Sequence, residues 1–206
     1  MQDSFKKYNI NISDKEAALL EQYHQTLIKW QKAINLIGTT TIEEAVIRHF
    51  LDSAQLINHI EDKNIKLVDM GSGAGFPGLV LAMMGIKEVH LIESDVRKAT
   101  FLRTVSRETN LNNVIVHNKR VENCEISNID LITARALAPL DKLFSMAKAI
   151  KGESKDISYL FMKGEKLEQE LEESAKKWSF EHKIFTSLSD SSGKIIKITN
   201  LEAKNS

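Results

Sequence analysis

Three alternating glycines, Gly71, Gly73 and Gly75, directly follow an apolar stretch that ends in Asp69 and Met70. Glycine has no Cβ atom, so it adopts positive φ angles readily and lets a ligand approach the main chain closely. The residues after the third glycine are typical of a helix, and the unpaired N–H groups at its start would point toward such a ligand. This order of strand, glycine loop and helix predicts a binding site for a cofactor that carries a nucleoside.

The spacing of the glycines narrows the choice of cofactor. The dinucleotide fingerprint G-x-G-x-x-G would have its third glycine at position 76, where this chain has Phe76. A phosphate-binding Walker loop would end in Gly-Lys-Ser or Gly-Lys-Thr, which this loop lacks. Glu93 ends the next predicted strand, about 20 residues beyond Gly73, where an acid commonly binds the two hydroxyls of a ribose. The pattern favours S-adenosylmethionine over a nicotinamide dinucleotide.

The residues that follow the predicted fourth strand limit the chemistry of methyl transfer. Methylation of an exocyclic amine usually relies on a loop of Asp or Asn followed by two prolines and an aromatic residue, but residues 133–140 read TARALAPL. Methylation at a pyrimidine carbon needs a cysteine nucleophile, and the single cysteine, Cys124, is expected in a polar loop as an incidental residue. A ring nitrogen with an in-plane lone pair, such as N7 of guanine, needs neither group. We therefore expect no catalytic side chain, and positioning of the reactants instead.

The helices expected before the glycine loop have clear start signals. Ser13 and Glu16 form a capping box in front of a helix predicted over residues 14–33. A second capping box, Thr41 with Glu44, precedes another amphipathic pattern. Each helix has one apolar face, so we expect the two to pack together as an N-terminal helical cap.

The remainder of the chain, residues 64–206, alternates short apolar runs with amphipathic stretches, which predicts βαβ units and a parallel sheet. The last two strands are expected to form an antiparallel hairpin at the sheet edge. The predicted strands are residues 67–70, 89–92, 114–117, 130–133, 159–162, 180–185 and 194–198, and the predicted helices are residues 77–84, 95–109, 140–149 and 165–177. We therefore predict an α/β fold, a Rossmann-like seven-stranded sheet of the class I S-adenosylmethionine-dependent methyltransferase type, with residues 1–63 as its helical cap. Ligands of such sheets bind beyond the carboxyl ends of the strands.

Composition sets limits on the class of protein. The chain has 206 residues, 42% of them hydrophobic, which is enough to bury one core. Its longest apolar run, residues 76–85, is broken by Pro77 and Gly78 and is about half as long as a membrane span. A single cysteine cannot form an internal disulfide, and the first residues are polar rather than leader-like, so we expect a cytoplasmic protein without a membrane anchor. We also expect no metal ion.

Local charge differs from the overall balance. The formal net charge is zero, which disfavours nonspecific coating of nucleic acid. Between residues 97 and 120, however, six basic residues stand against one acid. Such a run is usually a solvated helix face, but it is also suited to contact with a polyanion.

Several motifs resemble, in their order along the chain, those of one family. The segments are RHFLDS at 48–53, DMGSGAGFPG at 69–78, LIES at 91–94, RK at 97–98, FLR at 101–103, RVE at 120–122, ARA at 134–136 and MKG at 162–164. They are similar to the ribosomal RNA small subunit methyltransferase G family, also called glucose-inhibited division protein B. The resemblance implies that S-adenosylmethionine donates a methyl group to N7 of guanine 527, in a loop of 16S rRNA, with the 30S ribosomal subunit as partner in the bacterial cytoplasm.

The resemblance also implies roles for individual residues. The family's cofactor contacts would fall on Gly71, Phe76, Val121, Glu122 and Arg135. Val121 and Glu122 could flank the adenine, and the guanidinium of Arg135 offers paired donors that suit a carboxylate. Arg135 could instead form a structural ion pair. Together with the residues inferred from spacing, the expected cofactor-binding residues are Gly71, Gly73, Gly75, Phe76, Glu93, Val121, Glu122 and Arg135.

The expected RNA contacts are basic side chains, namely Arg48, Arg97, Lys98, Arg103, Arg107 and Lys163. Arg48 could instead pair with Asp52, four residues further along one helix face, with His49 buried beside it. Lys163 ends a strand and is expected to meet a phosphate or the substrate base, where Arg135 could help it to position the reactants. Two alternatives stay open: an NAD-dependent oxidoreductase, and a noncatalytic RNA-binding or assembly module.

Overall fold

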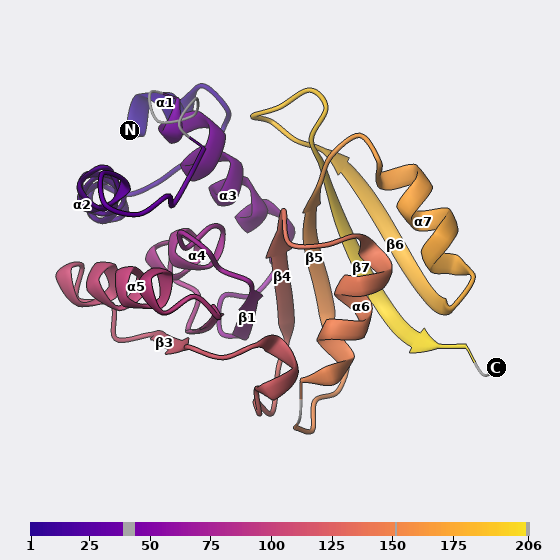
Figure 1. The fold of residues 1–206 in the computed structure, drawn as a ribbon. Coiled ribbons are helices and arrows are strands. Elements are labelled where there is room, and N and C mark those ends of the chain that lie inside the picture. Colours follow the sequence, from indigo (N-terminus) through magenta and orange to yellow (C-terminus); the bar gives the residue numbers. More distant parts are fainter. Residues whose placement is uncertain (39–43, 151, 205–206) are drawn as a thin grey trace.

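The computed structural model describes residues 1–38, 44–150 and 152–204, and a seven-stranded sheet forms its centre (Figure 1). The strands are β1 (Lys66–Met70), β2 (Glu88–Ile92), β3 (Val114–His117), β4 (Leu131–Arg135), β5 (Ser158–Lys163), β6 (Trp178–Thr186) and β7 (Lys194–Ala203). Their order in the sheet is β3-β2-β1-β4-β5-β7-β6. β1 to β5 run parallel, whereas β7 is antiparallel to both β5 and β6. The predicted α/β sheet with its C-terminal hairpin is confirmed.

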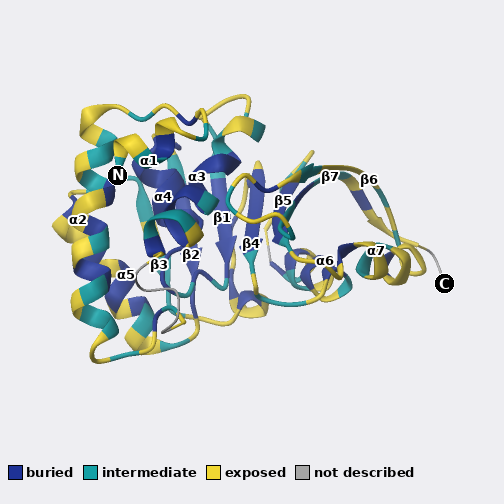
Figure 2. Cartoon of the chain, turned by 90° about the horizontal axis from the view of Figure 1, so that it is seen from above, coloured by how far each residue is buried: buried dark blue, intermediate teal, exposed yellow. Residues whose placement is uncertain are grey.

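Helices lie on both faces of the sheet. They are α2 (Asp14–Gln31), α4 (Gly78–Met83), α5 (Val96–Glu108), α6 (Leu140–Ala149) and α7 (Leu167–Ala175). α2 packs against α4 and α5, while α6 packs against α7. Adjacent residues of β1 point to opposite faces of the sheet. Leu67 packs in the apolar cluster that includes α2, α4 and α5, and Val68 packs in the cluster that includes α6. Burial is concentrated in the central strands and α4, and the outer surfaces of α2, α5 and α7 are exposed (Figure 2).

The first predicted helix is confirmed as α2, with its capping box in place. The Ser13 hydroxyl accepts a hydrogen bond from the Glu16 N–H (3.2 Å), and the Glu16 carboxylate accepts one from the Ser13 N–H (2.7 Å). Of the second capping box, only Glu44 belongs to the described residues, so the box itself lies outside them. The short helix α1 (Gln2–Lys6), which the sequence patterns do not predict, buries Phe5 completely.

The second predicted helix is helical but irregular. It consists of a π-helical turn, η2 (Val46–Leu51), a single α-helical turn, α3 (Asp52–Ala54), and a 3-10 turn, η3 (Gln55–His59). The prediction of a regular amphipathic helix is therefore wrong in detail. His49, Phe50 and Leu51 are all buried, and three consecutive residues spread over about 200° of a regular α-helix. The wider π-helical turn reduces this spread.

The N-terminal helices and the sheet share a core. Leu20 of α2 and Phe50 belong to the same apolar cluster as Leu67 of β1 and Leu79 of α4. The division of the chain at residue 63 stays a prediction. No helix in the described ranges is both long and apolar enough to cross a lipid bilayer.

Candidate cofactor and acceptor site

The three glycines of the loop after β1 all have positive φ, as predicted, but for different reasons. The φ angles are +65° at Gly71, +55° at Gly73 and +96° at Gly75. A Cβ at Gly71 would lie 2.5 Å from Leu137, and one at Gly75 would lie 2.5 Å from Leu79. A Cβ at Gly73 would meet nothing closer than the Gly71 carbonyl oxygen at 3.8 Å. Gly71 and Gly75 are therefore required by packing, and Gly73 is the glycine that borders open space.

Glu93, at the end of β2, is fixed directly beside Gly73. Its carboxylate accepts a hydrogen bond from the Gly73 N–H (2.8 Å) and another from the Asp95 N–H (2.7 Å). The side-chain amide of Asn118, after β3, donates to the Glu93 carbonyl oxygen (2.9 Å) and so holds the ends of β2 and β3 together. A carboxylate has about four lone-pair sites, so Glu93 keeps acceptors for ribose hydroxyls. The predicted proximity of the acid and the glycine loop is confirmed.

Asp69 stabilises the glycine loop from the buried side through its hydrogen bonds. Its carboxylate accepts hydrogen bonds from the Thr133 hydroxyl of β4 (2.8 Å) and from the Gly78 N–H at the start of α4 (3.3 Å). Burial raises the pKa of Asp69 to about 6, against the opposing effects of hydrogen bonds from Thr133, Ser72 and Gly78 and of the charge of Arg135. Because Asp69 is fully buried, it supports the loop rather than contacting a ligand.

Tyr23 of α2 supports the same loop, a role that the sequence patterns do not reveal. Its hydroxyl donates a hydrogen bond to the Ala74 carbonyl oxygen. The Tyr23 ring stacks on Phe76, with centroids 5.4 Å apart. Burial raises the pKa of Tyr23 well above its usual value, so its hydroxyl stays protonated as a donor. In the sequence, Tyr23 is only one residue of the apolar face of a helix.

Phe76 lies inside an aromatic cluster. Its ring stacks on His49 at 5.2 Å between centroids and meets Phe50 edge-on at 5.1 Å. The guanidinium carbon of Arg135 lies 5.6 Å from the Phe76 ring centroid. The Phe76 side chain is 7% exposed, so it positions His49 and Arg135 rather than forming an open wall for a cofactor.

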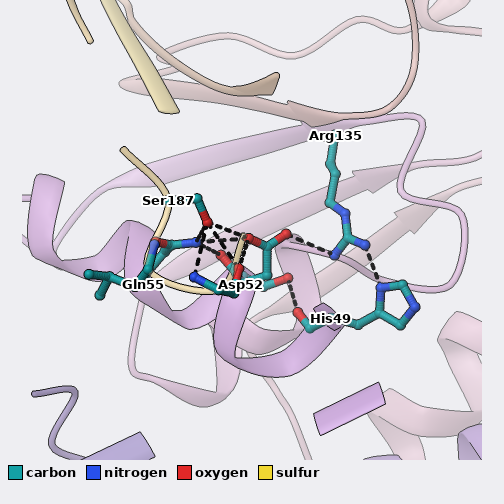
Figure 3. A network of polar contacts seen from close by, with 8 residues as sticks. His49, Asp52, Gln55, Arg135 and Ser187 are labelled. Atoms are coloured by element: carbon teal, nitrogen blue, oxygen red, sulfur yellow. Dashed lines mark hydrogen bonds and ion pairs between the residues drawn. The ribbon is translucent and has the colours of Figure 1, made fainter. Parts of the chain in front are cut away.

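Arg135, at the end of β4, is held by groups from the irregular helical segment (Figure 3). Its guanidinium is hydrogen-bonded to Nδ1 of His49, and its Nη1 atom lies 3.6 Å from the Asp52 carboxylate. Burial lowers the pKa of Arg135, while Asp52, Tyr23 and Asp69 act in the opposite direction. Nη1 is buried and has no hydrogen-bond partner within the part of the chain that the structure describes. This donor is therefore suited to an anionic ligand group.

The alternative in which Arg48 pairs with Asp52 is wrong. Arg48 Nε instead lies 2.7 Å from the Glu44 carboxylate, and Asp52 faces Arg135. The π-helical turn between Arg48 and Asp52 is the physical reason, because the four-residue spacing no longer returns to the same face.

His49 is buried and neutral. Burial, together with the charges of Arg135 and Arg48, lowers its pKa to about 3. Since Nδ1 faces a guanidinium donor, the ring proton of the neutral imidazole belongs on Nε2.

The pKa of His49 predicts an acid-dependent loss of stability. The folded protein keeps His49 neutral down to about pH 3, whereas the unfolded chain binds a proton below about 6.5, so stability falls as the pH drops below 6.5. We expect the free energy of unfolding of the wild type, relative to His49→Gln, to decrease by about 2 kcal/mol between pH 6.5 and pH 5. Urea unfolding of both proteins across this range measures the difference. Parallel pH profiles would contradict the assignment.

A cavity of about 420 Å³ lies at the carboxyl ends of β4 and β5. Arg135 lines it, whereas Gly73 and Glu93 do not. Arg135 thus connects the cavity to the aromatic cluster that follows the glycine loop. Side chains from four parts of the chain line the cavity, among them Arg48, Asp52, Lys163, Glu170, Ser189 and Lys194.

Lys163, predicted as a substrate contact, lines this cavity but is already paired. Its ammonium group lies 2.5 Å from the Glu170 carboxylate and donates to the Ala138 carbonyl oxygen (2.9 Å). Glu170 also accepts a hydrogen bond from the Leu140 N–H (2.8 Å). The Lys163 side chain is 9% exposed, so the structure gives it a clear role in joining β5 to α7 and to the loop after β4.

The other predicted site residues lie outside this cavity. Val121 and Glu122 form the 3-10 turn η4 (Val121–Asn123) after β3, with Val121 buried and Glu122 exposed. Arg97, Arg103 and Arg107 are exposed along α5, whereas Lys98 is half-buried, about 100° around the helix from Arg97. The four basic residues of α5 therefore do not share one face.

Cys124 corrects a further expectation. It is 1% exposed and belongs to the apolar cluster of α6, rather than to a polar loop. Burial raises the pKa of its thiol, and the thiol donates to the Arg120 carbonyl oxygen (3.6 Å). Both features oppose a role as a nucleophile. In residues 1–38, 44–150 and 152–204 there is also no group of three or more His, Cys, Asp or Glu side chains that could hold a metal ion.

Sequence comparisons match this chain over most of its length. A family described as rRNA small subunit methyltransferase G matches residues 16–199. A Ribosomal RNA small subunit methyltransferase G from Rhodospirillum rubrum is 40% identical over 190 residues, which cover 92% of this chain and 93% of the relative. The protein of that name from Paramagnetospirillum magneticum is 47% identical over 179 residues, which cover 87% of this chain and 86% of the relative.

Solved structures share the fold at low sequence identity. M. jannaschii TYW2 in complex with AdoMet has a TM-score of 0.57 and 17% identity, covering 84% of this chain and 80% of that protein. A SAM-dependent methyltransferase from Aquifex aeolicus has a TM-score of 0.58 and 14% identity, covering 85% of this chain and 97% of that protein. The fold is the Rossmann-like α/β fold of class I methyltransferases, as predicted.

Proposed function

Because the chain belongs to the rRNA small subunit methyltransferase G family, we propose that it transfers a methyl group from S-adenosylmethionine to N7 of guanine 527 in 16S rRNA. The single structural observation that carries this proposal is the open face of Gly73 beside the fixed carboxylate of Glu93. The reaction would take place on the 30S subunit or its RNA, in the bacterial cytoplasm.

The residues around the glycine loop fit an adenosyl cofactor that ends in an amino acid. The ribose hydroxyls would bind Glu93 next to Gly73, where a Cβ would fill the approach. Val121 and Glu122 would flank the adenine. The buried Nη1 donor of Arg135 would gain a partner in the cofactor's carboxylate. We propose as cofactor-binding residues Gly71, Gly73, Gly75, Phe76, Glu93, Val121, Glu122 and Arg135, with Phe76 contributing through its support of Arg135.

The acceptor side fits a nucleophile that needs no base. S-adenosylmethionine supplies an electrophilic methyl group bound to a sulfonium. The protein has to hold guanine N7 in line with the bond between that group and sulfur. The lone pair of N7 would form the new bond as the methyl–sulfur bond breaks, S-adenosylhomocysteine would leave as a neutral thioether, and N7 would lose no proton. The loop at residues 134–140 contains no carboxylate. The cavity at the ends of β4 and β5 has a volume suited to a nucleobase, with Arg48 at its wall for a phosphate.

A labelling experiment tests the function. Purified protein, tritiated S-adenosylmethionine and 30S subunits from a strain that lacks the modification are expected to yield labelled 16S rRNA, with N7-methylguanosine after digestion. Naked 16S rRNA as a parallel substrate reports whether the assembled particle is required. Label confined to protein or small molecules would contradict the proposal.

A nicotinamide-dependent oxidoreductase has less support. Phe76 occupies the position of the third fingerprint glycine, and the matching family consists of methyltransferases. Calorimetry with NADH and with S-adenosylhomocysteine distinguishes an oxidoreductase from a methyltransferase. Binding of NADH alone would favour the oxidoreductase.

We further propose that the exposed arginines of α5 contact RNA phosphates. Replacing Arg97, Arg103 and Arg107 with Ser is expected to weaken RNA binding and to reduce the slope of log K against log salt by about 2 to 3. Lys98→Ser is the matched control, because Lys98 is half-buried whereas the three arginines are exposed. Filter binding at several salt concentrations measures the slope. An unchanged slope in the triple variant would mean that these arginines form only a solvated face.

A further inference from the structure

The carboxylate of Asp52 joins three parts of the fold that are distant in the sequence (Figure 3). Its Oδ1 atom accepts hydrogen bonds from Gln55 Nε2 (2.8 Å), Ser187 Oγ (3.2 Å) and Ser189 Oγ (2.5 Å). Its Oδ2 atom lies 3.6 Å from Nη1 of Arg135. One carboxylate therefore contacts the helical segment, the loop between β6 and β7, and the end of β4.

The loop between β6 and β7, residues 187–193, is fastened to the helical segment by this cluster. Gln55 adds two contacts, because its carbonyl oxygen accepts from the Leu188 N–H (2.7 Å) and its amide donates to Ser187 Oγ (2.9 Å). The loop also forms one wall of the cavity at the ends of β4 and β5, through Ser187, Ser189, Asp190 and Gly193. The position of this wall thus depends on Asp52 and Gln55.

The two oxygens of Asp52 belong to one rigid group, so their contacts are not independent. Three donors occupy Oδ1, and together they fix the plane of the carboxylate. That plane sets the position of Oδ2 relative to Arg135. At 3.6 Å the contact to Arg135 is an ion pair rather than a hydrogen bond, so Nη1 remains available to a ligand while its position is held by charge.

We propose that Asp52 is a positioning residue that couples the loop at residues 187–193 to Arg135. The same carboxylate then fixes the position of two groups. One is the wall of the cavity at the ends of β4 and β5, where the acceptor is proposed to bind, and the other is Arg135, which is proposed to bind the cofactor. This inference rests on the proposed function, because it takes Arg135 as a ligand of the cofactor. A purely structural role for Asp52 would affect stability, but it would not transmit changes in the loop to cofactor binding.

Calorimetry with S-adenosylhomocysteine on four proteins tests the coupling. They are the wild type, Asp52→Asn, the double variant Ser187→Ala/Ser189→Ala, and the triple variant that combines them. We expect Asp52→Asn to bind about tenfold more weakly and the double variant about threefold more weakly than the wild type. The triple variant should bind no more weakly than Asp52→Asn, because the loop acts through this residue. Wild-type affinity in the double variant, or effects that multiply in the triple variant, would overturn the proposal.

Ser192→Ala is the matched control in the same loop. Its hydroxyl bonds to Asp190 (2.8 Å) instead of Asp52, so its affinity for S-adenosylhomocysteine should equal that of the wild type. Thermal melting without ligand identifies variants that fail to fold. If Asp52→Asn unfolds, the double variant alone decides, since its weaker binding supports the coupling and unchanged binding refutes it. A wild type that neither binds S-adenosylhomocysteine nor methylates 16S rRNA would instead refute the proposed function.

Discussion

Gly73→Asn is expected to weaken the binding of S-adenosylhomocysteine by at least about 100-fold, with little change in folding. Asn tolerates the left-handed conformation of this residue, whose φ is +55°. Its side chain would meet no close neighbour in the protein and would project into the open space beside Glu93. If an adenosyl ligand occupies that space, the Asn side chain excludes it. Calorimetry and a thermal melt of the ligand-free protein provide the two measurements.

Gly85→Asn is the control for this substitution. Gly85 also has a positive φ, +95°, and a Cβ there would lie 3.7 Å from Lys63, an ordinary contact. It follows α4 and precedes β2, so it lies away from the carboxyl ends of the strands. We expect this variant to bind the ligand normally. Normal methylation by Gly73→Asn would favour a noncatalytic pocket, and equal losses in both variants would point to backbone strain.

Arg135→Lys is expected to lower kcat/KM for methylation of the 30S subunit by about 100- to 1,000-fold. Lys keeps the positive charge next to Asp52, but it has neither the planar fork of donors nor the flat surface that lies over Phe76. Arg135→Met is expected to be as inactive and also to lose about 3–5 kcal/mol of stability, because it leaves Asp52 without its cation. Steady-state kinetics and urea unfolding measure the two effects.

The comparison of the two Arg135 variants separates recognition from simple charge balance. If charge alone matters, Arg135→Lys should retain most of the activity and the affinity for S-adenosylhomocysteine. If the arginine binds the cofactor through its fork, both variants should bind this ligand weakly, although only the Met variant is unstable. Unchanged ligand affinity in both would remove Arg135 from the cofactor site.

Local patterns in the sequence are sufficient to predict most of the fold. The alternation of apolar runs and amphipathic stretches predicts all seven strands, because each strand and helix buries its own apolar residues. The capping box at Ser13 predicts the start of α2 to the residue. The segment from Val46 to His59 differs, since its amphipathic pattern predicts a regular helix, and this pattern does not reveal the π-helical and 3-10 turns that the structure has.

The candidate site is predictable only where it is local in sequence. The glycine loop and Glu93 can be identified from spacing, and the structure brings them together. Asp52 pairs with Arg135, which lies far along the chain, and Lys163 pairs with Glu170 of the following helix, so neither helix periodicity nor strand ends indicate these partners. Such pairs depend on the tertiary fold, because sequence spacing alone does not show which of several carboxylates a cation contacts.

The hydrogen bond from Tyr23 to Ala74 has a consequence for attempts to shorten this protein. A fragment that begins at β1 would contain every glycine of the loop and all seven strands, but it would expose the back of the loop to water where α2 now seals it. If the glycine loop binds the methyl donor as proposed, we expect the smallest unit able to retain it to include the helices that precede the sheet, and we expect a module of the sheet and its connecting helices alone to lose it.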